Sequence, residues 1–161
     1  MNRERLRSMI KFVISILTCQ SAGIIGSFFT FPAIQEWYAF LNKPAFNPPN
    51  WVFAPVWTIL YTLMGIAMFL VWTKGLHVPG VKKALSVFLF QLVLNSLWSI
   101  VFFGAHSIIG GFVIILILWS AIVWTIVQLF SVSKWAAALL IPYILWVSFA
   151  VILNCALVFL N

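Results

Sequence analysis

The sequence predicts an all-α fold: a polytopic membrane protein with a single bundle of five transmembrane helices, forming one domain over residues 1–161. Hydrophobic residues make up 65% of the chain and charged residues only 7%, whereas about a quarter of the residues in a soluble domain are charged. The mean hydropathy is +1.16, and apolar stretches of about 20 residues match the thickness of a hydrocarbon core. So few charges cannot cover a water-exposed surface, and the composition therefore indicates a membrane protein.

Polar, glycine-containing and proline-containing breaks separate the apolar segments and mark the ends of the expected helices. The five spans are expected at about 9–29, 51–72, 83–103, 108–130 and 135–160. The connections between the later spans are short, and the one long connection, 30–50, follows the first span. The chain has room for one compact bundle and for no second domain.

The first span begins after a basic N-terminus and is predicted to end before Pro32. Its apolar run, 12–31, is longer than the core of a signal peptide, roughly 7–15 residues, so we expect it to stay in the mature protein. Small residues recur along one face and allow another helix of this chain, or a second copy of the protein, to approach closely. These residues are Ser15, Cys19, Gly23 and Ser27.

Two prolines lie inside the later spans. Pro55 falls in the first turns of the second span, where the missing backbone N–H costs little. Pro142 lies further inside the fifth span and frees a carbonyl near Ala138, so the sequence predicts a local bend there. Such a bend opens space between helices.

The basic residues predict the orientation of the bundle. An odd number of spans places the N-terminus and the second and fourth connections on one side, and this side accounts for the whole net charge of +7. On the other side Glu36 and Lys43 cancel. Because basic connections stay in the cytoplasm, we expect a cytoplasmic N-terminus, an external first connection and C-terminus, and a location in the cell membrane. The expected partners of the basic residues are anionic membrane lipids, not nucleic acid.

The spans lack the residue types that ordinary acid–base catalysis and proton coupling require. No Asp, Glu, Lys or Arg lies near the middle of any span. His77 and His106 fall in connections on opposite sides, so no shared metal site is expected. An enzyme with conventional acid–base groups is therefore not favoured.

Aromatic and amide side chains are the remaining candidates for a binding site. Trp57 and Tyr61 share a face of the second span, Gln91, Asn95 and Trp98 share a face of the third, and Trp146 lies on the fifth with Tyr143 beside its stripe. Aromatic stripes occur more often in helix packing than in ligand sites. The amides are expected to point inward. They either form hydrogen bonds to other helices or offer hydrogen bonds to an apolar, planar ligand, and the sequence leaves both interpretations open. Proline residues stiffen the long connection, so it is well placed to form a lid over the bundle.

At this connection the sequence resembles the translocator protein family, which comprises the tryptophan-rich sensory proteins of bacteria and the related peripheral benzodiazepine receptor of mitochondria. The resemblance rests on motifs in order along all five spans. These are Trp37-Tyr38, Lys43-Pro44, Pro48-Pro49, Phe53-Ala54-Pro55-Val56-Trp57, Gln91, Asn95, Trp98, Phe102-Phe103, Pro142-Tyr143, Trp146, Phe149-Ala150 and Asn154.

The resemblance implies a five-helix bundle, often a homodimer, with a pocket in the half nearest the long connection. It implies porphyrin or haem-type tetrapyrrole ligands and no obligatory cofactor. The implied lining is Tyr38, Pro48, Trp57, Gln91, Asn95, Trp98, Tyr143, Trp146, Phe149 and Ala150, to which the aromatic stripe adds Tyr61. Trp57 and Trp146 correspond to tryptophans associated with light-dependent porphyrin breakdown.

One departure from the family bears on the ligand. The end of the fifth span lacks the tyrosine and the basic residue of the cholesterol-recognition segment found in animal members. The tetrapyrrole is therefore favoured over a sterol. The resulting hypothesis is a membrane receptor or sensor for a small hydrophobic ligand of the tetrapyrrole class. The alternatives are a transporter of porphyrins or lipid-like molecules and a light-dependent porphyrin-degrading protein.

Overall fold

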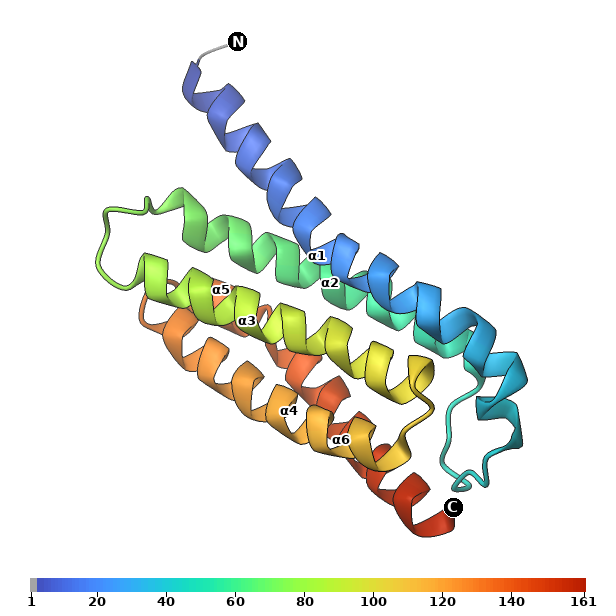
Figure 1. Cartoon of the computed structure of the whole chain (residues 1–161). Helices are drawn as coiled ribbons and strands as arrows, with labels where there is room; N and C mark the ends of the chain where they lie inside the picture. Colours follow the sequence, from blue (N-terminus) through green and yellow to red (C-terminus); the bar gives the residue numbers. More distant parts are fainter. Residues whose placement is uncertain (1–2) are drawn as a thin grey trace.

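A computed structural model describes residues 3–161, and the fold within that range is entirely helical. Five helical segments are long and apolar enough to cross a membrane, which confirms the predicted fold class. The elements are α1 Arg3–Glu36, a short 3-10 helix η1 Tyr38–Phe40, α2 Asn50–Thr73, α3 Val81–Ser99, a π-helical turn η2 Ile100–Gly104, α4 Ile108–Phe130, α5 Lys134–Ala138 and α6 Ile141–Leu160. Figure 1 shows α2, α3, α4 and α6 running side by side while α1 crosses them at an angle.

The end predicted for the first span is wrong, because α1 runs through Pro32 to Glu36. A proline inside a helix removes only one hydrogen bond, and packing on the flanking turns compensates for that loss. Ala33 is buried against Tyr38, and the Trp37 amide donates to the Ala33 carbonyl at 3.0 Å. The connection to α2 is therefore 37–49, shorter than expected.

The third span ends in a different kind of helix from the one expected. α3 stops at Ser99 and continues as the π-helical turn η2, in which the Ala105 amide donates to the Ile100 carbonyl at 2.9 Å. A π-helical turn places the side chains that follow it at a new angle. Here it brings Phe102 and Phe103 into the interior.

The bend predicted near Pro142 is confirmed. The fifth span is divided into α5, ending at Ala138, and α6, beginning at Ile141, with Pro142 in the first turn of α6. The Ser133 hydroxyl accepts a hydrogen bond from the Ala136 amide at 3.3 Å and caps α5. Pro142 lies where its missing N–H leaves no gap in the hydrogen bonds of α6.

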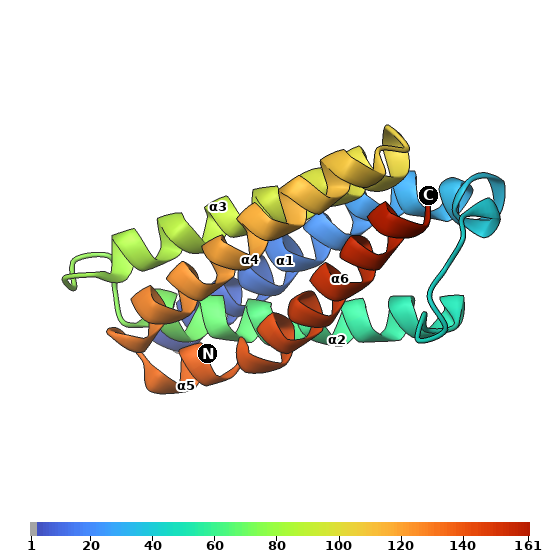
Figure 2. The same cartoon turned by 90° about the horizontal axis from the view of Figure 1, so that it is seen from below.

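The backbones of α1 and α2 approach each other closely at Gly65. A Cβ atom at Gly65 would lie 2.9 Å from the Cα of Ile16 and 3.2 Å from the carbonyl oxygen of Ser15. Ser15 and Cys19 are fully buried at this contact, so α2 of the same chain is the helix that packs on this part of the small-residue face. The two helices diverge from the crossing in both directions, as the N-terminal end of α1 in Figure 1 and its other end in Figure 2 show.

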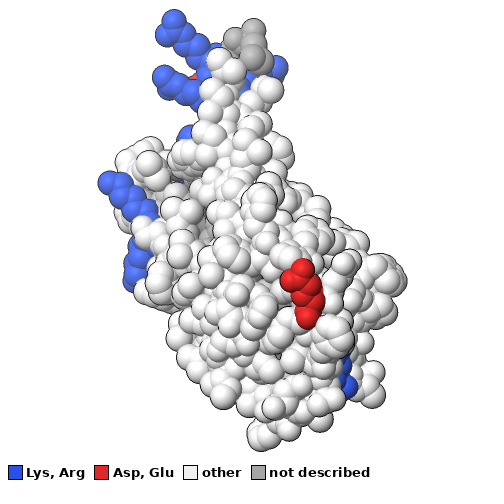
Figure 3. Space-filling view, turned by 45° about the vertical axis from the view of Figure 1, so that its right-hand side comes forward, with Lys and Arg blue, Asp and Glu red and all other residues white. Residues whose placement is uncertain are grey.

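The two ends of the bundle differ in charge. Figure 3 shows most of the basic side chains gathered around the start of α1 and the neighbouring edge, with one acidic side chain and part of one basic side chain on the opposite half. Near the long connection, Lys43 donates to the carbonyl oxygens of Ala39 and Leu41. The structure thus separates the charges as the sequence predicts, while the side of the membrane that each end faces stays a prediction.

Candidate ligand-binding cavity

A cavity of about 310 Å³ lies between α1, α2, α3 and α6, in the half of the bundle nearest the 37–49 connection. Twenty-four residues line it, and no acidic, basic or histidine side chain is among them. The lining consists of Gln20, Gly23, Ile24, Gly26, Ser27, Thr30, Phe31, Ile34, Tyr38, Asn50, Phe53, Ala54, Trp57, Thr58, Tyr61, Trp98, Ser99, Phe102, Phe103, Trp146, Ala150, Leu153, Asn154 and Leu157.

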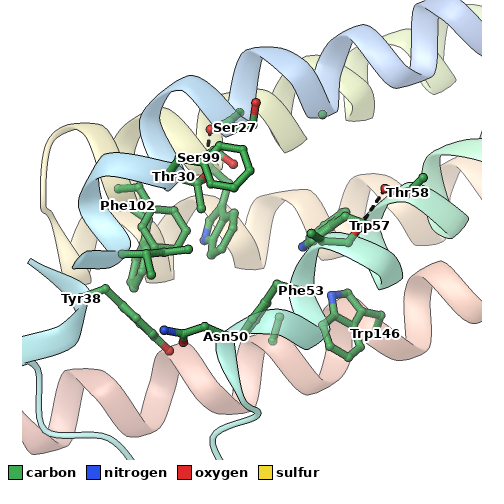
Figure 4. A pocket seen from close by; sticks show the side chains of 18 of the residues that line it. Ser27, Thr30, Tyr38, Asn50, Phe53, Trp57, Thr58, Ser99, Phe102 and Trp146 are labelled. Carbon is green, nitrogen blue, oxygen red and sulfur yellow. Dashed lines mark hydrogen bonds between the residues drawn. The ribbon is translucent and has the colours of Figure 1, made fainter. Parts of the chain in front are cut away.

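Aromatic rings form two ends of the cavity. Figure 4 shows Trp57 and Trp146 at one end and Tyr38 and Phe102 at the other. Trp57 stacks on its neighbour Tyr61 with ring centroids 5.4 Å apart, and Phe102 stacks on Trp98 at the same centroid distance. Stacked rings of this kind present flat apolar surfaces, which suit a flat apolar ligand.

Two buried polar atoms in the lining have no hydrogen-bond partner among the described residues. One is a donor, the indole Nε1–H of Trp98, and the other is an acceptor, the side-chain Oδ1 of Asn154. The amide nitrogen of Asn154 is already used, since it donates to the Ala150 carbonyl at 2.9 Å. A buried polar atom without a partner is costly, but neither atom has water-accessible surface in this structure. A ligand that offers an acceptor to Trp98 and a donor to Asn154 would therefore satisfy both only after these side chains turn toward the cavity.

A buried hydrogen-bond network connects α2, α3 and α6 at the edge of the cavity. The Tyr61 hydroxyl donates to Asn95 Oδ1, Asn95 Nδ2 donates to the Tyr143 hydroxyl at 3.1 Å, and the Tyr143 hydroxyl donates to Gln91 Oε1 at 3.0 Å. The inward direction predicted for the amides is confirmed. In this structure they bond across helices, and of the network only Tyr61 lines the cavity.

The structure brings six of the predicted binding residues together around the cavity: Tyr38, Trp57, Tyr61, Trp98, Trp146 and Ala150. The other five, Pro48, Gln91, Asn95, Tyr143 and Phe149, are not part of its lining. Phe149 packs on Trp146 with centroids 5.6 Å apart, and the Pro48 carbonyl accepts a hydrogen bond from Asn47 at 3.1 Å. Ligand contact by any of the eleven stays a prediction.

Sequence reasoning missed the wall formed by α1. Eight residues from Gln20 to Ile34 line the cavity, whereas the small-residue pattern of this helix indicated only packing against another helix. The available signal was the recurrence of small residues, because Gly23 and Ser27 lie on the predicted face. That face continues past the crossing with α2 and, once the helices diverge, borders the cavity instead of a neighbouring backbone.

The 37–49 connection, which we call the lid, closes one end of the cavity through Tyr38, its one residue in the lining, and its opening stays a prediction. Tyr38 is only 4% exposed and packs against Phe102 and Phe103. Its hydroxyl donates to Asn47 Oδ1 at 2.7 Å, and the Lys43 ammonium lies 4.9 Å from its ring centroid. Burial raises the pKa of Tyr38 to about 12, against a smaller opposing effect of Asn47. The phenol therefore stays a neutral donor at physiological pH.

A clip between Asn42 and Asn161 ties this lid to the end of α6. The Asn42 amide donates to Asn161 Oδ1 at 2.9 Å, Asn161 Nδ2 donates to the Asn42 carbonyl at 3.0 Å, and Asn42 Nδ2 donates to the Leu160 carbonyl at 3.1 Å. Hydrogen bonds therefore run both from Asn42 to Asn161 and from Asn161 to Asn42. They attach the lid to α6, the helix that carries Trp146.

Replacing Asn161 by alanine is expected to loosen the lid without unfolding the bundle. Loss of the exposed clip should cost about 1 kcal/mol, which increases the equilibrium constant for lid opening about fivefold. Hydrogen–deuterium exchange measures this directly, because the Asn42 amide is a donor in the clip. Gln128→Ala, at the other end of the bundle, is the control. Unchanged exchange of residues 37–49 would show that the clip does not hold the lid.

The fold and this cavity define a class: a polytopic membrane protein with an uncharged, aromatic cavity among its helices. The profile of the TspO/MBR family matches residues 15–160. The chain is 46% identical over 154 residues to the Tryptophan-rich protein TspO of Archaeoglobus fulgidus, covering 96% of this chain and 99% of the relative. It is 37% identical over 127 residues to the Tryptophan-rich sensory protein of Cereibacter sphaeroides (79% and 78%) and 39% identical over 131 residues to the Translocator protein of Homo sapiens (81% and 78%). The chain belongs to the TspO/MBR family.

Proposed function

We propose that the protein is a membrane receptor that binds a planar, hydrophobic tetrapyrrole in the cavity beneath the lid. The observation that carries the proposal is the pairing of flat aromatic ends with a lining that has no charged side chain. Flat rings with a few directed polar groups favour a flat, mostly apolar ligand over a sugar or an ion. The word "sensory" in the name of the Cereibacter sphaeroides relative supports signalling.

The size of the cavity adds a condition to this proposal. At about 310 Å³ it is near the lower limit for a drug-sized ligand, roughly 300 Å³, and a tetrapyrrole with its substituents is larger. Binding therefore requires outward movement of the lid or protrusion between α1 and α2. Residues bordering the cavity on this side are exposed, Ile24 at 57% and Phe31 at 66%.

Protoporphyrin IX is expected to quench the tryptophan fluorescence of the purified protein, and Trp57→Phe with Trp146→Phe should weaken its affinity at least tenfold. The reason is that both indoles supply flat contact area, worth about 1 kcal/mol each beyond area burial. The matched control is Trp124→Phe with Trp135→Phe, since both side chains are exposed outside the cavity. Because removing Trp residues lowers the signal, affinity is also measured by porphyrin absorbance. Equal affinity in the two double variants would contradict the proposed site.

A transporter is the second candidate, and the exposed border between α1 and α2 favours it because it offers lateral access from the bilayer. The buried network of Tyr61, Asn95, Tyr143 and Gln91 favours the receptor instead, since it closes the cavity toward the basic half. Porphyrin flux into proteoliposomes distinguishes the two. Flux that saturates and disappears in the Trp57/Trp146 variant would favour transport.

We further propose a cytoplasmic N-terminus and a location in the cell membrane, because the basic residues gather at one end. In a background with Cys19→Ala and Cys155→Ala, a membrane-impermeant maleimide applied to intact cells should label Ala45→Cys and not Leu76→Cys. Both positions are exposed in connections at opposite ends. The reverse labelling pattern would contradict the orientation.

A further inference from the structure

A second space between α1 and α2 lies on the other side of their crossing from the cavity. It is a groove of about 270 Å³ lined by Ser8, Met9, Phe12, Val13 and Phe69. Its floor is the edge-to-face pair of Phe12 and Phe69, with ring centroids 5.3 Å apart. The groove exists because the N-terminal end of α1 leans away from α2 beyond the close contact at Gly65 (Figure 1).

The groove lies at the level where the apolar part of the bundle ends. Lys11 donates from its ammonium to the Trp72 carbonyl at 3.2 Å and lies 5.7 Å from the Trp72 ring centroid. Trp and Lys side chains are typical of the membrane interface, so this contact marks the head-group level. Phe12, Val13 and Phe69 are deeper along their helices, while Ser8 is one turn nearer the N-terminus.

Positive charge lies beside the upper part of the groove. Arg5 precedes the lining residues Ser8 and Met9 by three and four residues, so it lies one helical turn above them on the same face of α1, and Lys11 follows Ser8 by one turn. The Lys11 ammonium has three N–H donors and the carbonyl of Trp72 uses one of them. Glu4 is the only acidic residue in this part of the described helix.

We propose that this groove binds one anionic phospholipid. An acyl chain lies on Met9, Phe12, Val13 and Phe69, and the phosphate accepts hydrogen bonds from Lys11 and Ser8, with Arg5 adding charge. The combination of an apolar floor and a basic rim at the interface matches the chemistry of such a lipid. A second copy of this chain is disfavoured as the occupant, because it would bring its own basic residues against these.

The proposal is tested by native mass spectrometry of the full chain in detergent, with phosphatidylglycerol and phosphatidylcholine of identical acyl chains. We expect at least one bound phosphatidylglycerol and about tenfold weaker retention of phosphatidylcholine. Arg5→Gln with Lys11→Gln should weaken phosphatidylglycerol binding about tenfold. Lys82→Gln with Lys83→Gln removes the same amount of charge from the same end of the bundle. This control should leave the affinity for phosphatidylglycerol within about twofold of that of the unmodified protein. Equal losses in both pairs would overturn the proposal, because they indicate diffuse attraction and no site.

The apolar part of the site has its own test. Val13→Gln places an amide in the groove and is expected to weaken phosphatidylglycerol binding severalfold, whereas Val93→Gln, on the exposed face of α3, should not. Excess inorganic phosphate should fail to displace the lipid, because the acyl chain contributes to binding. Displacement by phosphate, or equal effects of the two glutamine variants, would overturn the lipid assignment. Circular dichroism confirms that each variant retains its helices.

Discussion

Replacing Gly65 by leucine is expected to lower the free energy of unfolding by about 3 kcal/mol, the upper part of the range for overpacking a helix interface. A Cβ atom at this position would meet backbone atoms of α1, the Cα of Ile16 at 2.9 Å and the carbonyl of Ser15 at 3.2 Å. Backbone cannot rotate away as a side chain can, so α1 has to move. Because α1 forms one wall of the cavity, ligand binding should fall with stability.

Gly104→Leu is the matched control for this substitution. There the three atoms nearest to the added Cβ atom all belong to the ring of Phe29, a 37% exposed side chain, and none belongs to the backbone. The expected change is below about 1 kcal/mol. Unfolding of both variants is followed by circular dichroism in mixed detergent micelles with increasing sodium dodecyl sulfate. Similar losses for the two variants would show that the crossing at Gly65 is less constrained than the distances indicate.

Replacing Asn95 by leucine is expected to destabilise the bundle by about 2 kcal/mol, because it leaves the buried Tyr61 hydroxyl without a partner and removes one of the two partners of the Tyr143 hydroxyl. Tyr61 loses the acceptor of its hydrogen bond, and Tyr143 loses the donor that Asn95 supplies. Both side chains are almost completely inaccessible. The loss exceeds the average of about 0.6 kcal/mol for hydrogen bonds between membrane helices, since the network joins three of them.

A second variant distinguishes the loss of the hydrogen-bond network from a simple loss of side-chain packing. In Asn95→Leu combined with Tyr61→Phe, no Tyr61 hydroxyl remains to be orphaned, so about half of the lost stability should return. Ser96→Ala, next to Asn95, is the control, because the Ser96 hydroxyl makes only long contacts of 3.4 and 3.5 Å. If the double variant is less stable than Asn95→Leu alone, the Tyr61 hydroxyl still stabilises the bundle without Asn95, and an orphaned hydroxyl is not the cause of the loss.

These two predictions concern the same property of the cavity, its rigid boundary. The crossing at Gly65 and the network at Asn95 lie between the cavity and the basic half of the bundle, whereas the lid is held only by the exposed clip at Asn42 and Asn161. Movement that admits a ligand is therefore expected at the lid and between the diverging ends of α1 and α2. The core behind Tyr61 should change little.

The amides show how far sequence reasoning extends. Gln91, Asn95 and Asn154 were expected to face inward because an amide facing lipid is costly, and all three are buried. The pattern did not show what they face. Gln91 and Asn95 bond to tyrosines of other helices, while Asn154 lines the cavity with a free acceptor. Facing inward is a property of one helix, but the partner depends on where its neighbours lie.

The error at Pro32 has a similar cause. Local rules place the end of a helix before a proline, since one hydrogen bond is lost there. The burial of Ala33 against Tyr38 outweighs that loss and extends α1 to Glu36. At Pro142 the local rule and the packing agree, and the predicted bend appears. Proline therefore predicts where a helix is weak, while tertiary contacts decide whether it stops.

The sequence by itself determined the membrane class, the number of spans, the separation of charge between the two ends and the aromatic character of the interior. These properties follow from composition and periodicity, which can be read from each segment alone and do not depend on which helix packs against it. Only the tertiary structure decided that α1 crosses α2 at Gly65, and that this crossing leaves an aromatic cavity on one side and a basic-rimmed groove on the other. The crossing depends on backbone contact between residues 15 and 65, and no pattern along a single helix encodes the distance between two helices.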